Sequence, residues 1–250
     1  MFSDTHTSTE GSHVSRQKGI FRRILVAFGH VAVIAIAVYG VSLLVHWRNE
    51  GRSIVCVANS KLLGRCMLGY REQYGHLPPA HVVASDGRLM HSWRILVSEH
   101  FMPTDPDPYD FKEPWDSVNN TRFGDYRPER FACPNDSVTW RNRRLTNYFV
   151  VTGRNTPFPD AGTTVGPRGA SNTIMMVEAR DLDIEWLEPR DLAFDRMSFI
   201  PNDPKRPSIS SHHADGPFVV MADGWVRSIK GIDPTVLRRM LEYHPDEEDD

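Results

Sequence analysis

The chain has 250 residues, with 29 Lys and Arg against 32 Asp and Glu, and a formal net charge of −3. This near-neutral balance argues against nucleic acid as a partner, because a nucleic-acid-binding surface needs clustered Lys and Arg. Hydrophobic residues make up 40% of the chain, which is enough to bury one ordinary core.

The N-terminal 23 residues are polar and basic, and the first 15 of them are expected to stay unfolded. Residues 24–45 then carry no charged side chain, and a run of that length suits a helix that crosses a bilayer. We therefore predict a transmembrane helix over 24–46. Because Lys and Arg favour the cytoplasmic side, the basic residues before the run place segment 1–23 in the cytoplasm. These residues are Arg16, Lys18, Arg22 and Arg23.

A cleaved signal peptide is the alternative explanation of the apolar run. Signal peptides have a shorter apolar core and end at a small-residue cleavage site, and no such pattern follows Val45. Instead His46, Trp47 and Arg48 follow, which are residue types that favour a membrane interface. The sequence therefore favours an anchor that the mature protein keeps.

An amphipathic helix is predicted to continue the membrane helix from Ser53 to Tyr74. Apolar residues recur there at three- and four-residue steps, while charged residues lie off that stripe. Gly75 provides a stop, and Pro78 and Pro79 behind it cannot continue the helix. A helix that is half in lipid and half packed on a globular head is the plan of pilins and pseudopilins.

Three cysteines allow at most one intramolecular disulfide. Cys56 and Cys66 are ten residues apart on the predicted helix, roughly 15 Å along its axis, so they cannot pair with each other. Any bridge would join Cys133 to one of them. Three buried free thiols are the other possibility, and both remain open.

The rest of the chain is predicted to form a mixed α+β head. Residues 89–101 have an amphipathic helical pattern, and 102–137 are rich in proline and therefore in loops. Residues 147–152 and 173–179 are β-branched or apolar runs bounded by turn residues, which indicates strands.

The C-terminal part contains the clearest hairpin pattern. Strands are predicted at 218–222 and 225–229, joined by Asp223-Gly224 in a type I′ turn. Asp233 is predicted to cap a final helix that has Pro234 at its first position. The acidic tail 243–250 is expected to be disordered because its charges repel one another.

Several motifs in this order resemble one family. His213 is followed by nine residues and then Asp223-Gly224. The first part has Cys56, Asn59 and Lys61 ahead of Tyr-Gly-x-x-Pro-Pro at 74–79, which differs from the family's Tyr-Gly-x-Pro-Pro exit in the spacing of the first proline. Further similar segments are HSWRILV, FKEPWDSVNN, FACPND, TNYFVV, SNTIMMVEA and IEWLEPRDLAFD. The chain thus resembles the DUF1559 family of exported, prepilin-like proteins of planctomycete-type bacteria, over roughly residues 55–235.

The resemblance implies an α+β, pilin-like fold, in which the long N-terminal helix packs on a mostly antiparallel β head, here 47–242. It implies export but no established activity. The chain departs from the family at the prepilin peptidase site, because the segment KGIFRRI at 18–24 lacks the usual glutamate, and no acidic residue lies between Ile20 and Val45. We therefore expect an unprocessed single anchor, with cleavage after Gly19 and filament formation left open.

No catalytic residue and no cofactor is assigned, and we do not expect an enzyme. His212 and His213 lie near Ser210, Ser211 and Asp215, the residue types of a hydrolase triad, but no G-x-S-x-G elbow is present. Adjacent residues of an extended chain also point to opposite faces.

Three residues are weak candidates for a divalent-cation site: His213, Asp223 and Glu178. They would meet if the segment before the hairpin folds back along it. The favoured alternative is structural, with His213 hydrogen-bonded to the turn or to the Glu178 carboxylate. The tryptophans of the head also allow two interpretations: they could form a surface on which sugars stack, or they could pack in the hydrophobic core. They are Trp93, Trp115, Trp140, Trp186 and Trp225.

The sequence as a whole favours a membrane-anchored, extracytoplasmic structural or interaction protein, whose head lies in the periplasm or at the cell surface. Its expected partners are the lipid bilayer, through 24–46, and either a second copy or another envelope protein. The alternative is an exported module that binds a carbohydrate or a cation.

Overall fold

The computed structural model describes residues 9–98, 109–159 and 171–243, and the side chains from Phe28 onward. The chain divides into two compact units, 1–50 and 51–250, which are described separately below. The helices are α1 (Thr9–Tyr74), α2 (Trp93–Leu96), α3 (Val118–Thr121), η1 (Arg122–Tyr126), η2 (Glu129–Phe131), α4 (Ser137–Arg141) and α5 (Pro234–Leu241). The strands are β1 (His81–Val83), β2 (Leu89–Ser92), β3 (Tyr148–Phe149), β4 (Val151–Thr152), β5 (Ile174–Glu178), β6 (Leu192–Ala193), β7 (Phe218–Met221) and β8 (Val226–Ser228).

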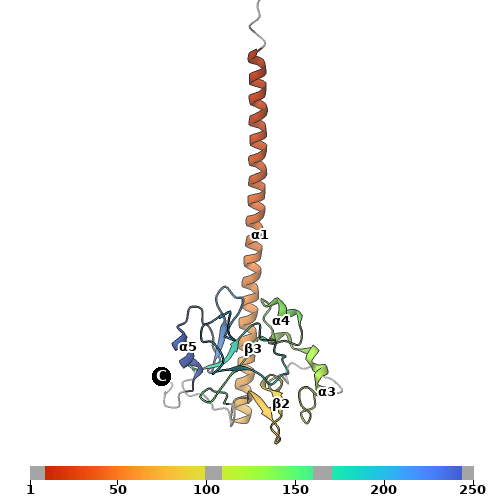
Figure 1. Ribbon diagram of the computed structural model, residues 1–250, viewed down its shortest axis with the longest axis vertical. Helices are drawn as coiled ribbons and strands as arrows, with labels where there is room; N and C mark the ends of the chain where they lie inside the picture. The colour runs from red at the N-terminus through yellow and green to blue at the C-terminus, as the bar shows by residue number, and fades with distance from the viewer. Residues whose placement is uncertain (1–8, 99–108, 160–170, 244–250) are drawn as a thin grey trace, which may run out of the picture. The chain divides into compact units, whose positions relative to one another are not determined.

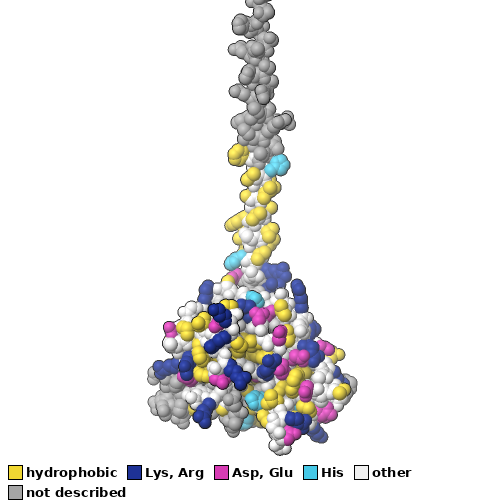
Figure 2. Space-filling model, viewed as in Figure 1, with side chains coloured by type: hydrophobic (Ala, Val, Ile, Leu, Met, Phe, Trp, Pro, Cys, Tyr) yellow, Lys and Arg dark blue, Asp and Glu magenta, His cyan; other side chains and the backbone are white. Residues whose placement is uncertain are grey.

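The first unit is helical from Thr9 onward and belongs to α1. Its apolar side chains are exposed, as shown by Phe28 at 70%, Ile36 at 71% and Leu44 at 66%, and they cover this part of α1 in Figure 2. This is the single helix, among the described residues, that is long and apolar enough to cross a membrane, and a signal sequence has the same properties. The expectation that 1–15 stay unfolded is wrong for 9–15, because extending an existing helix by one residue costs little.

The part of α1 in the second unit packs through one stripe. Cys56, Ser60, Leu63 and Met67 are all buried and recur at three- and four-residue steps. The helix ends at Tyr74, and the N–H of Gly75, at φ +80°, donates to the Arg71 carbonyl at 2.8 Å. These findings confirm the predicted long helix and its glycine stop.

The central sheet has four strands in the order β3-β5-β7-β8, and every pairing in it is antiparallel. Alternate residues of its strands point to opposite faces and enter two separate cores. Tyr148 and Val220 pack with α1 residues on one face, while Phe149 and Val219 pack with α5 on the other. Figure 1 shows the C-terminal part of α1 passing beside β3, with α5 at the edge of the same unit. The predicted α+β, pilin-like arrangement is thus present.

The hairpin β7-β8 is confirmed, but its turn differs from the predicted type. Type I′ needs positive φ at both central residues, and here Gly224, at φ +88°, has it while Asp223 does not. Gly224 N–H donates to the Met221 carbonyl at 2.9 Å, and Met221 N–H donates to the Trp225 carbonyl at 2.8 Å. This is a three-residue loop that closes with a glycine bulge.

The predicted helix over 89–101 is wrong in its first half. Leu89–Ser92 forms β2, which pairs antiparallel with β1, and a helix of only one turn follows. Ser92 is the reason for the boundary, because its extended backbone and its hydroxyl, which accepts from Arg94 N–H, make it an N-cap. Residues 99–101 lie outside the described part.

A buried ion pair fixes α2 within the second unit. Arg94 Nη2 lies 2.6 Å from Asp191 Oδ1, and neither side chain is more than 1% exposed. The same carboxylate oxygen accepts from Trp93 Nε1 and from the N–H of Val150. Asp191 immediately precedes β6, which pairs parallel with β4, so this cluster joins the two-stranded pair to the central sheet.

Candidate functional site

Four buried side chains with metal-ligating atoms meet in the second unit. They are Cys56 on α1, Cys133 after η2, Glu178 at the end of β5, and His213 in the loop before β7. Their Sγ, imidazole nitrogen and carboxylate oxygen atoms all lie within 4.8 Å of one another. The four come from segments far apart in sequence, so only the tertiary fold assembles them.

The two cysteines are held by different devices. Cys56 belongs to the buried stripe of α1, and its carbonyl accepts from the hydroxyl of Tyr148 on β3 at 3.3 Å. Cys133 lies in a loop whose backbone is fixed by Asn147, because its N–H donates to Asn147 Oδ1 at 2.8 Å. The side-chain amide of Asn147 in turn donates to Asp136 and to the Ala179 carbonyl. The two sulfur atoms lie 2.7 Å apart.

Glu178 and His213 complete the cluster from the sheet side. Glu178 faces Tyr148 in the β3-β5 register, and its Oε2 accepts from the N–H of Phe218 at 3.5 Å. Its other oxygen, Oε1, lies 3.2 Å from His213 Nε2. That same nitrogen is 3.2 Å from Cys133 Sγ, so the imidazole edge points between the carboxylate and a sulfur.

The second ring nitrogen of His213 has partners of its own. Nδ1 lies 2.9 Å from Ser53 Oγ on α1 and 2.9 Å from the amide nitrogen of Asn135. Asn135 Oδ1 is buried and has no hydrogen-bond partner among the described residues. Rotating this amide by half a turn would let Oδ1 accept a proton from Nδ1, so the surroundings accommodate either tautomer of the ring.

Burial and neighbouring groups change the proton affinity of the cluster. Burial alone lowers the pKa of His213, but its hydrogen bonds to Cys133 and Glu178 and the charge of Glu178 outweigh this and raise the pKa to about 10. Burial also raises the pKa of the Cys133 thiol far above its usual value, and the contact with Cys56 adds to this increase. These shifts favour an uncharged Cys133 thiol beside a protonated His213 ring.

The arrangement is suited to two kinds of chemistry. Two sulfurs, one imidazole nitrogen and one carboxylate oxygen form a donor set that Zn²⁺ prefers, whereas Ca²⁺ and Mg²⁺ prefer oxygen atoms alone. The two sulfurs by themselves could instead be oxidised to a disulfide. All three cysteines are described, and all three are free in the structure, with Cys66 away from this cluster.

The structure brings together two of the three residues proposed as metal candidates from sequence. His213 contacts Glu178, as both the metal and the structural interpretation expected. Asp223 lies outside the cluster, because it is exposed at the β7-β8 turn, where its carboxylate accepts from Trp225 N–H. Cys56 and Cys133 were missed as ligands, since 77 residues separate them and neither belongs to a C-x-x-C pattern.

The residue types of a hydrolase triad do not assemble into one. His212 and Asp215 are exposed, while His213 is buried and its backbone N–H donates to Ser211 Oγ. The hydroxyl of Ser210 donates to the Ser208 carbonyl instead of to an imidazole.

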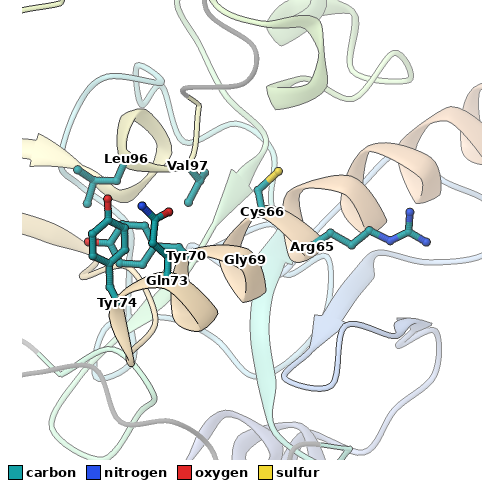
Figure 3. Close-up of a pocket in the computed structure, with 8 residues that line it drawn as sticks. All are labelled: Arg65, Cys66, Gly69, Tyr70, Gln73, Tyr74, Leu96 and Val97. Atoms are coloured by element: carbon teal, nitrogen blue, oxygen red, sulfur yellow. The ribbon is translucent and has the colours of Figure 1, made fainter.

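A shallow groove of about 240 Å³ lies on α1 beyond the cluster (Figure 3). Tyr70 and Tyr74 line it with ring centroids 4.4 Å apart, opposite Leu96 and Val97, and Cys66 lies at its edge. The remaining lining residues are Arg65, Gly69 and Gln73.

The tryptophans do not form one sugar-stacking surface. Trp93 and Trp186 are completely buried in the core, with Phe131 packed against both. Trp225, in contrast, is 68% exposed at the hairpin turn. The core interpretation therefore holds for the two largest buried side chains.

Comparisons with family models, with curated proteins and with solved structures find no match to this chain.

Proposed function

We propose that this chain is a membrane-anchored, extracytoplasmic structural or interaction protein of pseudopilin type. The observation that carries the proposal is the change of character along α1. Over 28–45 the helix exposes apolar side chains that water does not favour, and over 56–67 the same helix buries a stripe against a folded sheet. One continuous helix therefore has both a lipid-compatible part and a protein-packing part.

The residues around the apolar run support an N-terminus in the cytoplasm. The basic residues Arg16, Lys18, Arg22 and Arg23 precede the run. After the run Trp47 is 69% exposed between His46 and Arg48, which suits the outer interface of a bilayer. On this proposal the second unit lies in the periplasm or at the cell surface.

The resemblance to the DUF1559 family supports a pseudopilin-type role, and membership of that family is part of the proposal. A buried glutamate near the start of a pilin helix would be costly in lipid unless it were paired in an assembly. This chain has no acidic residue between Ile20 and Val45. We therefore propose a single anchor that acts through its second unit rather than a filament subunit.

Protease protection of the full-length chain tests the sidedness. If the proposal holds, protease degrades the second unit while the cytoplasmic membrane is still intact, either on intact cells or once the outer side is opened. Protection of the second unit until that membrane is lysed would contradict it.

A pair of variants tests the anchor itself. Replacing Ile34 and Val38 by Arg places two charges inside the apolar run. Each Arg raises the free energy of membrane insertion by about 2.5–3.5 kcal/mol, so the double variant should be released from membranes. Ile54→Arg is the control, because Ile54 is 70% exposed on the same helix beyond the run. Membrane retention of the double variant would contradict the proposal.

The cluster of Cys56, Cys133, Glu178 and His213 favours a second candidate, an exported cation-binding module. Nothing comparable in the described residues favours a carbohydrate, since Trp93 and Trp186 are buried.

A further inference from the structure

The four donor atoms lie within 4.8 Å of one another in the core of the second unit. Cys56 and Cys133 contribute sulfurs 2.7 Å apart, and His213 Nε2 is 3.2 Å from both Cys133 Sγ and Glu178 Oε1. In a tetrahedral zinc site the bond lengths place neighbouring donor atoms about 3.3–3.8 Å apart. The sulfur–sulfur distance is about 1 Å shorter than this, so the two sulfurs would move apart by about 1 Å around a bound ion.

A bound cation would account for the burial of these groups together. The side chains of His213 and Glu178 are 0% and 2% exposed, and burying a carboxylate and an imidazole is costly unless both are fully engaged. The sulfurs gain little from this polar pair, because an uncharged thiol is a weak hydrogen-bonding partner. A shared Zn²⁺ would engage all four groups at once.

The surroundings of His213 match those of a metal-bound histidine. Metal-ligating histidines usually donate their other ring N–H to a nearby oxygen, which fixes the tautomer. Here Ser53 Oγ lies 2.9 Å from Nδ1, and the buried Oδ1 of Asn135 lacks a partner among the described residues. With Nε2 on the metal, Nδ1–H would donate to Ser53, and the amide of Asn135 can turn its oxygen to the same proton.

We propose that the second unit holds one structural Zn²⁺, ligated by Cys56 Sγ, Cys133 Sγ, His213 Nε2 and Glu178 Oε1. Zn²⁺ binding replaces the two thiol protons, which pass to solvent, and involves no oxidation. Four protein ligands leave no open position and all are buried, which is the pattern of structural rather than catalytic zinc. The ion would tie α1 to the loop after η2, to β5 and to the loop before β7.

The competing state is a disulfide between Cys56 and Cys133. An extracytoplasmic compartment would permit this disulfide. Its formation joins the two sulfurs, passes two electrons and two protons to an oxidant, and so removes both sulfur ligands. A disulfide would not account for the burial of Glu178 and His213 beside the two sulfurs.

The zinc proposal is independent of the anchor proposal. Metal content tests the zinc site, and membrane fractionation tests the anchor.

The experiment measures metal on the full-length chain, purified in detergent without chelator and without a polyhistidine tag. Elemental analysis is expected to give about one zinc per chain. Reduced, metal-free protein titrated with Co²⁺ should take up one ion and develop thiolate-to-cobalt charge-transfer absorption together with the visible bands of a tetrahedral site.

Matched variants assign the ligands. Cys133→Ser and His213→Ala should lose at least about 90% of the bound zinc, as removal of a direct ligand predicts. Cys66→Ser and His212→Ala are the controls, because Cys66 lies at the groove and His212 is exposed beside His213. Both controls should keep wild-type zinc content.

Three results would overturn the proposal, and each starts from a preparation that was folded when it was purified. One is alkylation of the denatured, unreduced wild-type chain at Cys66 alone, with a peptide that links Cys56 to Cys133. Another is a fully reduced wild-type chain that binds neither Zn²⁺ nor Co²⁺. The third is zinc retained equally by Cys133→Ser, which would place the ion elsewhere.

Discussion

At the scale of single residues, Asp136 organises the loop that carries Cys133. It is 3% exposed, and its Oδ1 accepts from the N–H groups of Val138 and Thr139 at the start of α4. Its Oδ2 accepts from the hydroxyl of Thr139 and from the side-chain amide of Asn147. Burial would raise the pKa of this carboxyl, but these four hydrogen bonds outweigh burial and lower the pKa.

We predict that Asp136→Asn lowers the free energy of unfolding at pH 7 by about 1–3 kcal/mol, because the amide cannot accept from both Thr139 and Asn147. A lowered folded-state pKa means that the ionised carboxylate stabilises the fold above the unfolded pKa of about 3.9. That stability is lost as the pH falls through the folded pKa. Urea unfolding, followed by tryptophan fluorescence, should show the difference between wild type and variant shrinking below about pH 4.

The control for this prediction is Asp233→Asn, at the N-cap of α5. Asp233 also accepts from two backbone N–H groups, but it is exposed and has no second segment to hold. A larger loss in Asp233→Asn than in Asp136→Asn, or a pH-independent difference for Asp136→Asn, would contradict the argument.

Residue-level prediction from sequence succeeded where the cause was local. The Asp233 cap and the Gly75 stop follow from the backbone preferences of neighbouring residues, and the structure confirms both. The buried pair of Arg94 and Asp191 and the approach of Cys133 to Cys56 had no local signal. Such contacts depend on how distant segments pack, and a single sequence does not reveal that packing.

At the scale of elements, α1 comes close to the sheet at Gly64. A Cβ there would lie 2.7 Å from Val220 Cγ1 on β7, and Val220 is 1% exposed with a stiff β-branched side chain. Gly69, one turn and one residue further along the same helix, has no atom within 4 Å of the corresponding position. The two glycines therefore separate packing from helix propensity.

We predict that alanine stabilises the chain at Gly69 but not at Gly64. Gly69→Ala should raise the free energy of unfolding by about 1 kcal/mol, since alanine favours the helix. Gly64→Ala gains the same helix propensity, but its methyl group would be overpacked against Val220, which costs about 1–3 kcal/mol. Gly64→Ala should therefore be less stable than Gly69→Ala by about that amount. The measurement is the urea midpoint of each variant, and equal midpoints would show that α1 does not pack closely on β7.

Element-level prediction was right for strongly patterned segments and wrong where short elements meet. The β7-β8 hairpin and the strands around 147–152 and 173–179 had clear patterns, and all are present. The 89–101 helix failed because a strand and one helical turn together imitate helical spacing until Ser92 is recognised as a cap. The parallel pairing of β4 with β6 joins two-residue strands, which are too short to carry a pattern.

At the scale of the whole molecule, one helix belongs to both units of the chain. The apolar segment over 28–45 suits lipid, and the buried stripe over 56–67 suits the sheet, with no break in α1 between them. A cleaved signal peptide would remove the first segment and leave the second. We therefore infer that the mature chain keeps both.

The most direct test is the intact mass of the chain recovered from membranes after an alkaline carbonate wash. We expect the protein to stay with the membranes and its mass to include residues 24–45, whether it starts at Met1 or after Gly19. Recovery in the wash, with a mass that lacks residues 24–45, would contradict the account.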